Sequence, residues 1–294
     1  MGILLRDIPD INYEEQLKLE DGHMRLFFDY CADLVDNDIQ NELVNELMIR
    51  YAAVSKELEE KNVLLERYSN HLEELVEEKV REISASQIST IHALVKAAEL
   101  RDDDTGTHIE RTSSYCRLIA EKLRDAGMYP GVVDDNYAKN IEMASPLHDI
   151  GKIGIRDAIL LKPGKLTKEE FEIMKTHVTI GYETLASVVE NYKGNVFLKF
   201  GIEIARYHHE KWDGSGYMEG LSGEDIPLSA RIMALSDVYD ALRSKRVYKE
   251  AFTHEKAIGI IAEGRGTHFE PNLTDVFVSN HVRFREIYDR LAGE

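Results

Sequence analysis

Cysteine is scarce in this chain, and long apolar runs are missing. The two cysteines, Cys31 and Cys116, cannot build a disulfide framework, which favours a reducing cytoplasm. No apolar run approaches the roughly 18 residues of a transmembrane helix. The N-terminal sequence MGILLRDIPD turns acidic too early for a secretory signal. These absences predict a cytoplasmic protein without a membrane partner.

Positive charge is also in short supply. The chain has 36 Lys and Arg residues against 54 Asp and Glu residues, for a net charge of −18. Such a surface repels nucleic acids and anionic membranes, so we expect no nucleic-acid partner. A small phosphate compound can still bind if metal ions or a few placed Lys and Arg residues receive it.

Proline and glycine are absent between Asn41 and Leu100, a stretch rich in Glu, Leu, Lys and Val. Apolar side chains recur there in two seven-residue series offset by four, the a/d pattern of a coiled coil. We therefore predict one long helix, with 41–85 as a linker that joins two copies in a parallel homodimer. The alternative is a long helix folded back on its own domain. The two series are Leu47, Val54, Tyr68 and Leu75, and Tyr51, Leu58, Leu65 and Leu72.

The segments on either side of this linker differ in how much they reveal. Residues 1–40 are too short for a typical sensor domain and predict one amphipathic helix over Glu14–Leu34, which could contact a signalling partner. Residues 86–294 read as a helical domain with almost no strand signals, so the predicted fold class is all-α. Thr167 and Glu170 form a capping box that predicts a helix start.

Several His and Asp side chains fall on the inward faces of predicted helices. The adjacent pair His148 and Asp149 is a weak signal alone, because a core packing or capping role explains an isolated pair better than a metal site does. Burying such groups is costly unless they are paired or bound to metal, and several on different helices indicate a shared metal cluster. Each one singly could be a hydrogen-bonded core residue. The others are His108, His177, His208, His209, Asp237 and Asp240, whereas His23, His71, His92, His254 and His281 are expected at a surface or interface.

This donor set holds nitrogen and oxygen but no thiolate, which suits Mn²⁺, Fe or Zn²⁺. Two such ions can activate water and stabilise a phosphoryl transition state, so phosphate-ester hydrolysis is the expected reaction. Lys152, Arg246 and Lys249 lie where they could hold phosphate oxygens, or they could be solvated helix ends. The Gly-rich loop from Trp212 to Tyr217 could stack on a base, or it could be a surface turn.

Several long motifs in order resemble the HD-GYP family of the HD phosphohydrolase superfamily. They are HDIGKIGI (148–155), KPGKLTKEEFEIMKTH (162–177), HHEKWDGSGY (208–217), IPLSARIMALSDVYDAL (226–242) and GTHFEP (266–271). The resemblance covers about residues 86–290. The preceding helix resembles the coiled linker that joins such domains to sensory domains.

The resemblance implies hydrolysis of cyclic di-GMP to pGpG and on to GMP, and our hypothesis is that a metal-bridging hydroxide attacks the phosphodiester. Some members act on 3′,3′-cyclic GMP-AMP instead. It implies two or three divalent ions, Fe or Mn, with Asp149 and Lys152 in catalysis. The implied metal ligands are His108, His148, Asp149, His177, His208, His209 and Asp237, and the expected substrate contacts are Lys152, Tyr217, Asp240, Arg246 and Lys249.

The sequence departs from the family pattern at three positions. The signature Gly-Tyr-Pro ends in Met218, which removes the fixed φ of proline from the ligand-facing loop. Asp104 replaces the Glu that binds a third metal, and it is one methylene shorter. Arg156 stands where a proline is usual. Two alternatives stay open: hydrolysis of another nucleotide, and a non-catalytic cyclic-dinucleotide sensor that signals through its coiled coil.

Overall fold

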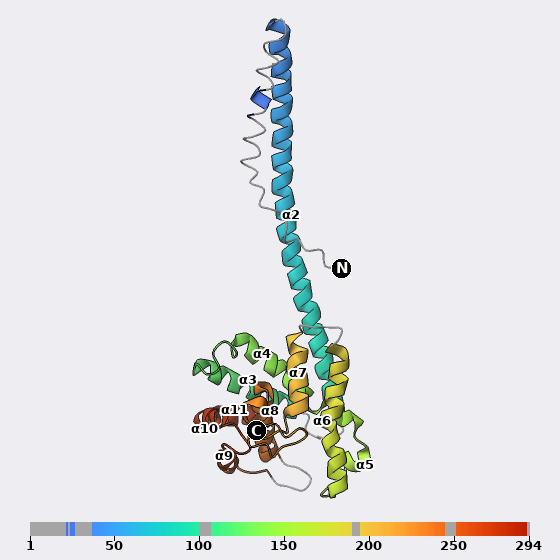
Figure 1. The fold of residues 1–294 in the computed structure, drawn as a ribbon, viewed down its shortest axis with the longest axis vertical. Helices are drawn as coiled ribbons and strands as arrows, with labels where there is room; N and C mark the ends of the chain where they lie inside the picture. The colour runs from blue at the N-terminus through green and yellow to red at the C-terminus, as the bar shows by residue number, and fades with distance from the viewer. Residues whose placement is uncertain are drawn as a thin grey trace. The chain divides into compact units, whose positions relative to one another are not determined.

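The computed structural model describes residues 22, 24–26, 37–99, 107–189, 195–244 and 251–292 (Figure 1). Across these ranges the regular elements are helices, and the only β-type pairing is an isolated bridge between Arg265 and Phe269. The predicted all-α fold class is therefore confirmed. Most of the helix predicted over Glu14–Leu34 lies outside the described residues. Three candidate residues also lie outside them, namely Asp104, Arg246 and Lys249.

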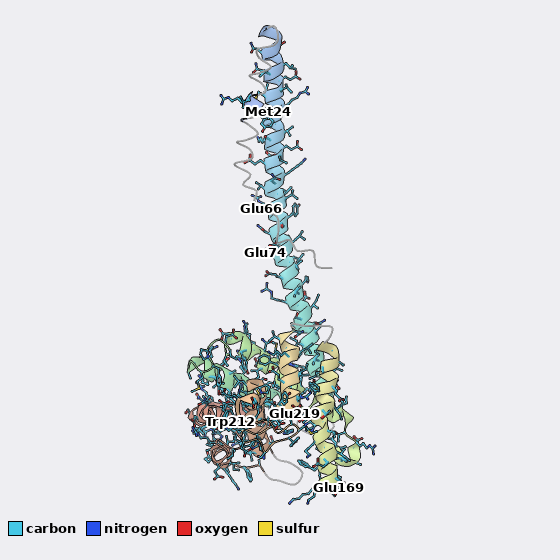
Figure 2. The ribbon with its side chains drawn as sticks, in the orientation of Figure 1. Met24, Glu66, Glu74, Glu169, Trp212 and Glu219 are labelled. Carbon is cyan, nitrogen blue, oxygen red and sulfur yellow. The ribbon has the colours of Figure 1, made fainter. Side chains whose placement is uncertain are left out.

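The longest element is α2, which runs without a break over 63 residues from Asn37 to Glu99. The predicted long helix is confirmed, because no proline or glycine interrupts it. Between residues 41 and 87 most of its side chains project to solvent, as Glu66 and Glu74 illustrate (Figure 2). The predicted heptad positions are exposed too, with Val54 at 63% and Leu65 at 65%. This apolar stripe suits a second helix, and the homodimer stays a prediction.

The chain divides into two units, Met1–Ile83 and Ser84–Glu294. The last turns of α2 belong to the second unit, where Val95 is buried in the core and His92 Nε2 lies 2.8 Å from the Met143 carbonyl oxygen. The other α-helices of this unit are α3 (His108–Asp125), α4 (Asp135–Ala144), α5 (Asp157–Leu160), α6 (Lys168–Val189), α7 (Val196–Tyr207), α8 (Leu228–Arg243), α9 (His254–Glu263), α10 (Pro271–Ser279) and α11 (His281–Ala292). Two 3₁₀ helices, η1 (Ser145–Gly154) and η2 (Gly223–Asp225), complete it.

Helix α3 lies at the centre of the second unit and packs against α4, α8, α10 and α11. The inward face of this helix is buried and carries Thr112, Tyr115, Ile119 and Leu123. The Tyr115 ring meets the buried Tyr239 ring of α8 edge-on at 5.1 Å. This core fixes the first residue of α3, His108, relative to the Asp side chains of α8.

The segment that carries His148 and Asp149 is the 3₁₀ helix η1. The α-helix α4 ends at Ala144, and Pro146 at the start of η1 has no N–H group with which to continue it. His148 still shares the buried side with Ile141 and Ala144.

A close backbone approach joins η1 to α6. A Cβ atom on Gly151 would lie 1.9 Å from the carbonyl oxygen of His177 and 2.5 Å from the backbone nitrogen of Gly181. Only glycine fits such a contact. Helix α6 begins with the predicted capping box, in which the Thr167 amide donates to Glu170 at 2.7 Å and the Glu170 amide donates to Thr167 at 3.2 Å. The Gly151 contact brings the neighbouring Asp149 beside His177.

Gly151→Ala should therefore destabilise the second unit by roughly 1–3 kcal/mol, because backbone atoms must move to admit the methyl group. Gly259→Ala is the matched control: Gly259 is exposed on α9 with nothing within 4 Å of its Cβ position. That variant should gain up to about 1 kcal/mol from helix propensity. Urea unfolding measures both, and equal stabilities would contradict the close approach.

Candidate metal centre

The predicted ligands come from five separate elements. His108 is the first residue of α3, His148 and Asp149 lie in η1, and His177 lies on α6. His208 and His209 follow the last residue of α7, and Asp237 lies on α8.

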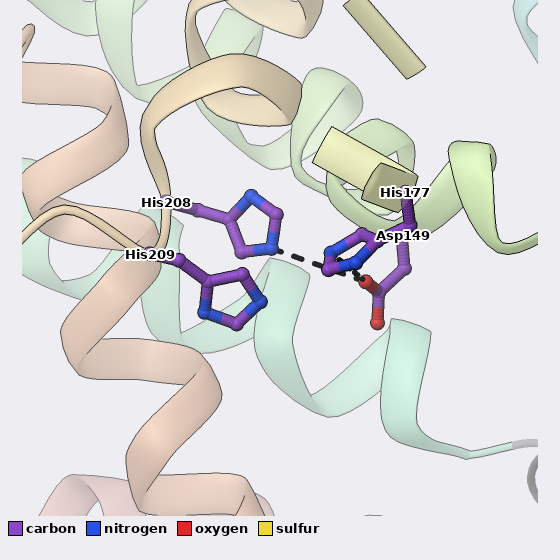
Figure 3. A group of neighbouring side chains, drawn as sticks. All are labelled: Asp149, His177, His208 and His209. Carbon is purple, nitrogen blue, oxygen red and sulfur yellow. Dashed lines mark ion pairs between the residues drawn. The ribbon is translucent and has the colours of Figure 1, made fainter. Parts of the chain in front are cut away.

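One group of potential ligands gathers on the first oxygen of the Asp149 carboxylate. His177 Nε2 lies 3.3 Å from Asp149 Oδ1, and His208 Nε2 lies 3.9 Å from the same oxygen (Figure 3). Together with His209, these side chains offer one donor atom each within 4.8 Å of one another. Such a set of three imidazoles and a carboxylate matches the donors that Mn, Fe and Zn ions take.

A second group faces the other oxygen of the same carboxylate. His148 Nε2 lies 3.1 Å from Asp149 Oδ2, and His108 Nε2 lies 3.4 Å from His148 Nε2. These three residues also hold donor atoms within 4.8 Å of one another. Among the described residues, Asp149 is the member common to both groups, with one oxygen turned to each.

Backbone carbonyls fix the direction of three imidazole rings. The Nδ1 atoms of His148, His177 and His208 lie 2.7–2.9 Å from the carbonyl oxygens of Ser145, Met174 and Ile204. A carbonyl oxygen only accepts, so each Nδ1 carries the proton and each Nε2 keeps a lone pair toward the cluster. The buried Nε2 atoms of His177 and His208 have no hydrogen-bond partner. Buried nitrogens left open in this way fit metal ligation.

The facing nitrogens of His108 and His148 also fit metal ligation. His108 Nδ1 lies 2.8 Å from Asp240 Oδ2 and donates to it, which directs Nε2 toward His148. Two lone pairs cannot face each other at 3.4 Å unless a proton or a cation lies between them. Two nitrogens bound to one tetrahedral ion by bonds of about 2.1 Å would lie roughly 3.4 Å apart.

The protonation states also fit metal ligation. Burial lowers the pKa of His208 to about 3, and burial lowers the pKa of His177 and of His209 as well. Burial would raise the pKa of Asp149, but the charges of Lys152 and His148 outweigh it and hold that pKa well below its usual value. At neutral pH these groups therefore present unprotonated donor atoms.

Asp240 occupies a different place from the substrate contact that the sequence predicts. Its side chain is 1% exposed, and it receives Arg111 Nε on Oδ1 at 2.6 Å and Arg111 Nη2 on Oδ2 at 2.8 Å. Oδ2 also accepts from His108. A carboxylate so fully engaged has no face for a ligand, so Asp240 orients His108 instead. Arg111 was missed in the sequence, although a charged residue one turn after His108 on the buried face of α3 was a signal.

The remaining predicted residues lie around this cluster. Asp237 is in neither group, and its Oδ1 is 3.7 Å from His108 Nε2. Lys152 Nζ lies 2.8 Å from Asp149 Oδ2. The Tyr217 ring stacks on His209, with centroids 4.8 Å apart and planes 27° apart. Met218, next to it, is 46% exposed.

One prediction about the other histidines was wrong. His254 is 3% exposed rather than on a surface, and its Nδ1 and Nε2 lie 2.9 Å from the Tyr239 hydroxyl and 3.1 Å from His281 Nδ1. No third ligand joins this pair among the described residues, so it belongs to the packing of α8, α9 and α11.

Comparison with known proteins identifies the family of the chain that carries this cluster. The model of the HD domain family matches residues 53–273. Among curated proteins of Vibrio cholerae, one named "Probable cyclic di-GMP phosphodiesterase" is 45% identical over 80% of this chain and 53% of its own length. One named "Cyclic di-GMP phosphodiesterase" is 46% identical over 74% of this chain and 44% of its own length. One named "3'3'-cGAMP-specific phosphodiesterase 2" is 41% identical over 66% of this chain and 35% of its own length.

The second unit is thus all-α and carries a cluster of His and Asp side chains that could hold metal ions. The chain belongs to the HD domain family, in its HD-GYP branch. It spans about half the length of the curated relatives that it matches. Among the described residues, no helix is both long and apolar enough to cross a bilayer.

Asp240→Asn should weaken metal binding about 10–100-fold, as loss of an outer carboxylate partner to a ligating histidine does. The amide keeps the size of the side chain but removes the charge that orients His108. Chelator competition with Mn²⁺ measures the affinity, and Asp225→Asn, at an exposed position in η2, is the control. Equal metal affinities for Asp240→Asn and wild type would contradict the positioning role.

Stability of the metal-free protein should fall as the pH drops from about 6.5 toward 3. The unfolded chain protonates its histidines near pH 6.5, whereas folding lowers the pKa of His208 to about 3, so the unfolded state binds more protons in this window. The stability is fully present above pH 6.5 and is lost on acidification. Denaturant unfolding at a series of pH values checks it, and His208→Gln should flatten the slope.

Proposed function

We propose that the chain is a metal-dependent phosphodiesterase that hydrolyses cyclic di-GMP to pGpG and further to GMP. The observation that carries the proposal is the Asp149 carboxylate, which turns one oxygen to each of two histidine groups. That arrangement suits two divalent ions, for which we propose Fe or Mn because the donors are imidazoles and carboxylates. The names of the relatives support cyclic di-GMP as the substrate.

When bound, the two ions would supply an activated water and positive charge for the phosphoryl oxygens. In this proposal His148 and His108 hold one position and His177, His208 and His209 hold the other. Asp149 keeps both groups in register, because each of its oxygens faces one of them.

Lys152 and Tyr217 are placed to act on the substrate itself. The Lys152 ammonium lies 2.8 Å from Asp149 Oδ2 with its side chain 28% exposed, so it can reach a phosphate oxygen beside the cluster. Burial raises the pKa of the Tyr217 hydroxyl, and the charges of Asp149 and Asp237 raise it further, so the group stays protonated and can donate. Asp237 completes the proposed ligand set. Asp104 as a third-metal ligand and Arg246 and Lys249 as phosphate contacts remain expectations from the sequence.

A second candidate substrate is 3′,3′-cyclic GMP-AMP. It is favoured by the 41% identity to a relative that is named as specific for this compound. The two substrates share the phosphodiester linkage and one guanine, so the metal chemistry is the same for both.

The decisive variant is Asp149→Ala. Turnover of cyclic di-GMP should fall by more than about a hundredfold, because both groups of ligands lose the carboxylate that they share. This loss exceeds the roughly 10–100-fold that is usual when a residue hydrogen-bonded to a metal ligand is removed. Asp225→Ala, at an exposed carboxylate in η2, should keep wild-type turnover.

The protein is purified without oxygen, its metals are counted by elemental analysis, and both cyclic dinucleotides are followed by chromatography. Full turnover by Asp149→Ala with full metal loading would overturn the scheme. Tight binding of a cyclic dinucleotide by metal-replete wild type without any product would instead establish the non-catalytic sensor.

A further inference from the structure

An aromatic side chain lies exposed beside the proposed catalytic centre. Phe171, on the first turn of α6, is 45% exposed. Its ring centroid lies 6.1 Å from that of Tyr217, with the two planes 79° apart. The contact therefore covers one edge of the pair and leaves apolar ring surface open to a ligand.

A cation lies against both rings. Lys175 is one helical turn beyond Phe171, and its Nζ lies 5.7 Å from the Phe171 centroid and 5.6 Å from the Tyr217 centroid. These separations are within the reach of a cation–π interaction. Its ion pair with Glu172 at 2.6 Å is weak, because the Glu172 side chain is 67% exposed. The Lys175 side chain itself is 19% exposed, and its ammonium can exchange Glu172 for a ligand.

The same aromatic group is continuous with the metal centre. The face of Tyr217 stacks on His209, which belongs to the first histidine group. Phe171 and Lys175 thus extend from the proposed ligands toward solvent along α6, the helix that also carries His177.

We propose that Phe171, Tyr217 and Lys175 form a platform that binds one guanine of the cyclic dinucleotide. An exposed ring face stacks on any base, and such stacking contributes substantially to binding. The Lys175 ammonium adds selectivity, because guanine presents two acceptors, O6 and N7, on one edge. Adenine presents a donor, its N6 amino group, in place of O6. This inference rests on the proposed function, since it assumes that a cyclic dinucleotide is the substrate.

The test uses bis(p-nitrophenyl) phosphate, a phosphodiester without a base, as the reporter of metal chemistry. Cyclic di-GMP and cyclic di-AMP are added as competitors, and their inhibition constants are measured on the full-length, metal-loaded protein. The variants are Phe171→Ala and Lys175→Met. Ile173→Ala is the control for Phe171, being 45% exposed on the same helix. Glu172→Gln removes the ion pair but keeps the Lys175 ammonium.

Phe171→Ala should raise the inhibition constants of both dinucleotides about tenfold and leave hydrolysis of the base-free ester unchanged. Lys175→Met should lower the preference for cyclic di-GMP over cyclic di-AMP about tenfold. Both control variants should behave as wild type. Unchanged inhibition constants in Phe171→Ala, or an equal change in Ile173→Ala, would overturn the platform while leaving the proposed function standing. Absence of inhibition by any cyclic dinucleotide in wild type would overturn both.

Discussion

The contact between one carboxylate and two groups of imidazoles is the constraint around which the second unit is organised. Asp149 can serve both groups only if the 3₁₀ helix η1 lies directly against α6. Gly151 allows that approach, because its missing side chain lets the two backbones meet. The closest approach at any described glycine therefore lies two residues from the proposed chemical centre.

The histidines of the first group, His177, His208 and His209, reach the cluster as neutral donors because burial lowers their pKa. Burial disfavours the protonated imidazole of His208, and the Ile204 carbonyl oxygen accepts a hydrogen bond from Nδ1 of the ring. His108 has a carboxylate partner instead, and burial, which lowers its pKa, is outweighed by the hydrogen bond and charge of Asp240. Arg111 in turn neutralises Asp240 in a place where an unpaired charge would be costly. The residues around the cluster, such as Asp240 and Arg111, thus fix the orientation and the protonation of the proposed ligands.

Much of this could be predicted from local patterns in the sequence. The absence of proline and glycine over 41–100 predicts α2, and the capping box of Thr167 and Glu170 predicts the start of α6. The ligand positions followed from inward-facing His and Asp residues and from motif resemblance. Each of these features depends on residues close together in the chain.

The features that were missed depend on contacts between distant segments. Arg111 and Asp240 are 129 residues apart, and no periodicity links them. The burial of His254 depends on Tyr239 and His281 of other helices. The platform beside Tyr217 likewise needs α6 and the signature loop to meet, so Phe171 alone reads as an exposed apolar residue. Local patterns predict faces and helix ends, whereas partners across the fold emerge only in three dimensions.

Anomalous X-ray scattering from crystals of the metal-loaded protein tests most directly whether Asp149 is shared by two metal ions. We expect two anomalous peaks about 3.5–4 Å apart, each next to one oxygen of Asp149. A single peak, or two peaks that do not share the Asp149 carboxylate, would show that Asp149 does not join two ions.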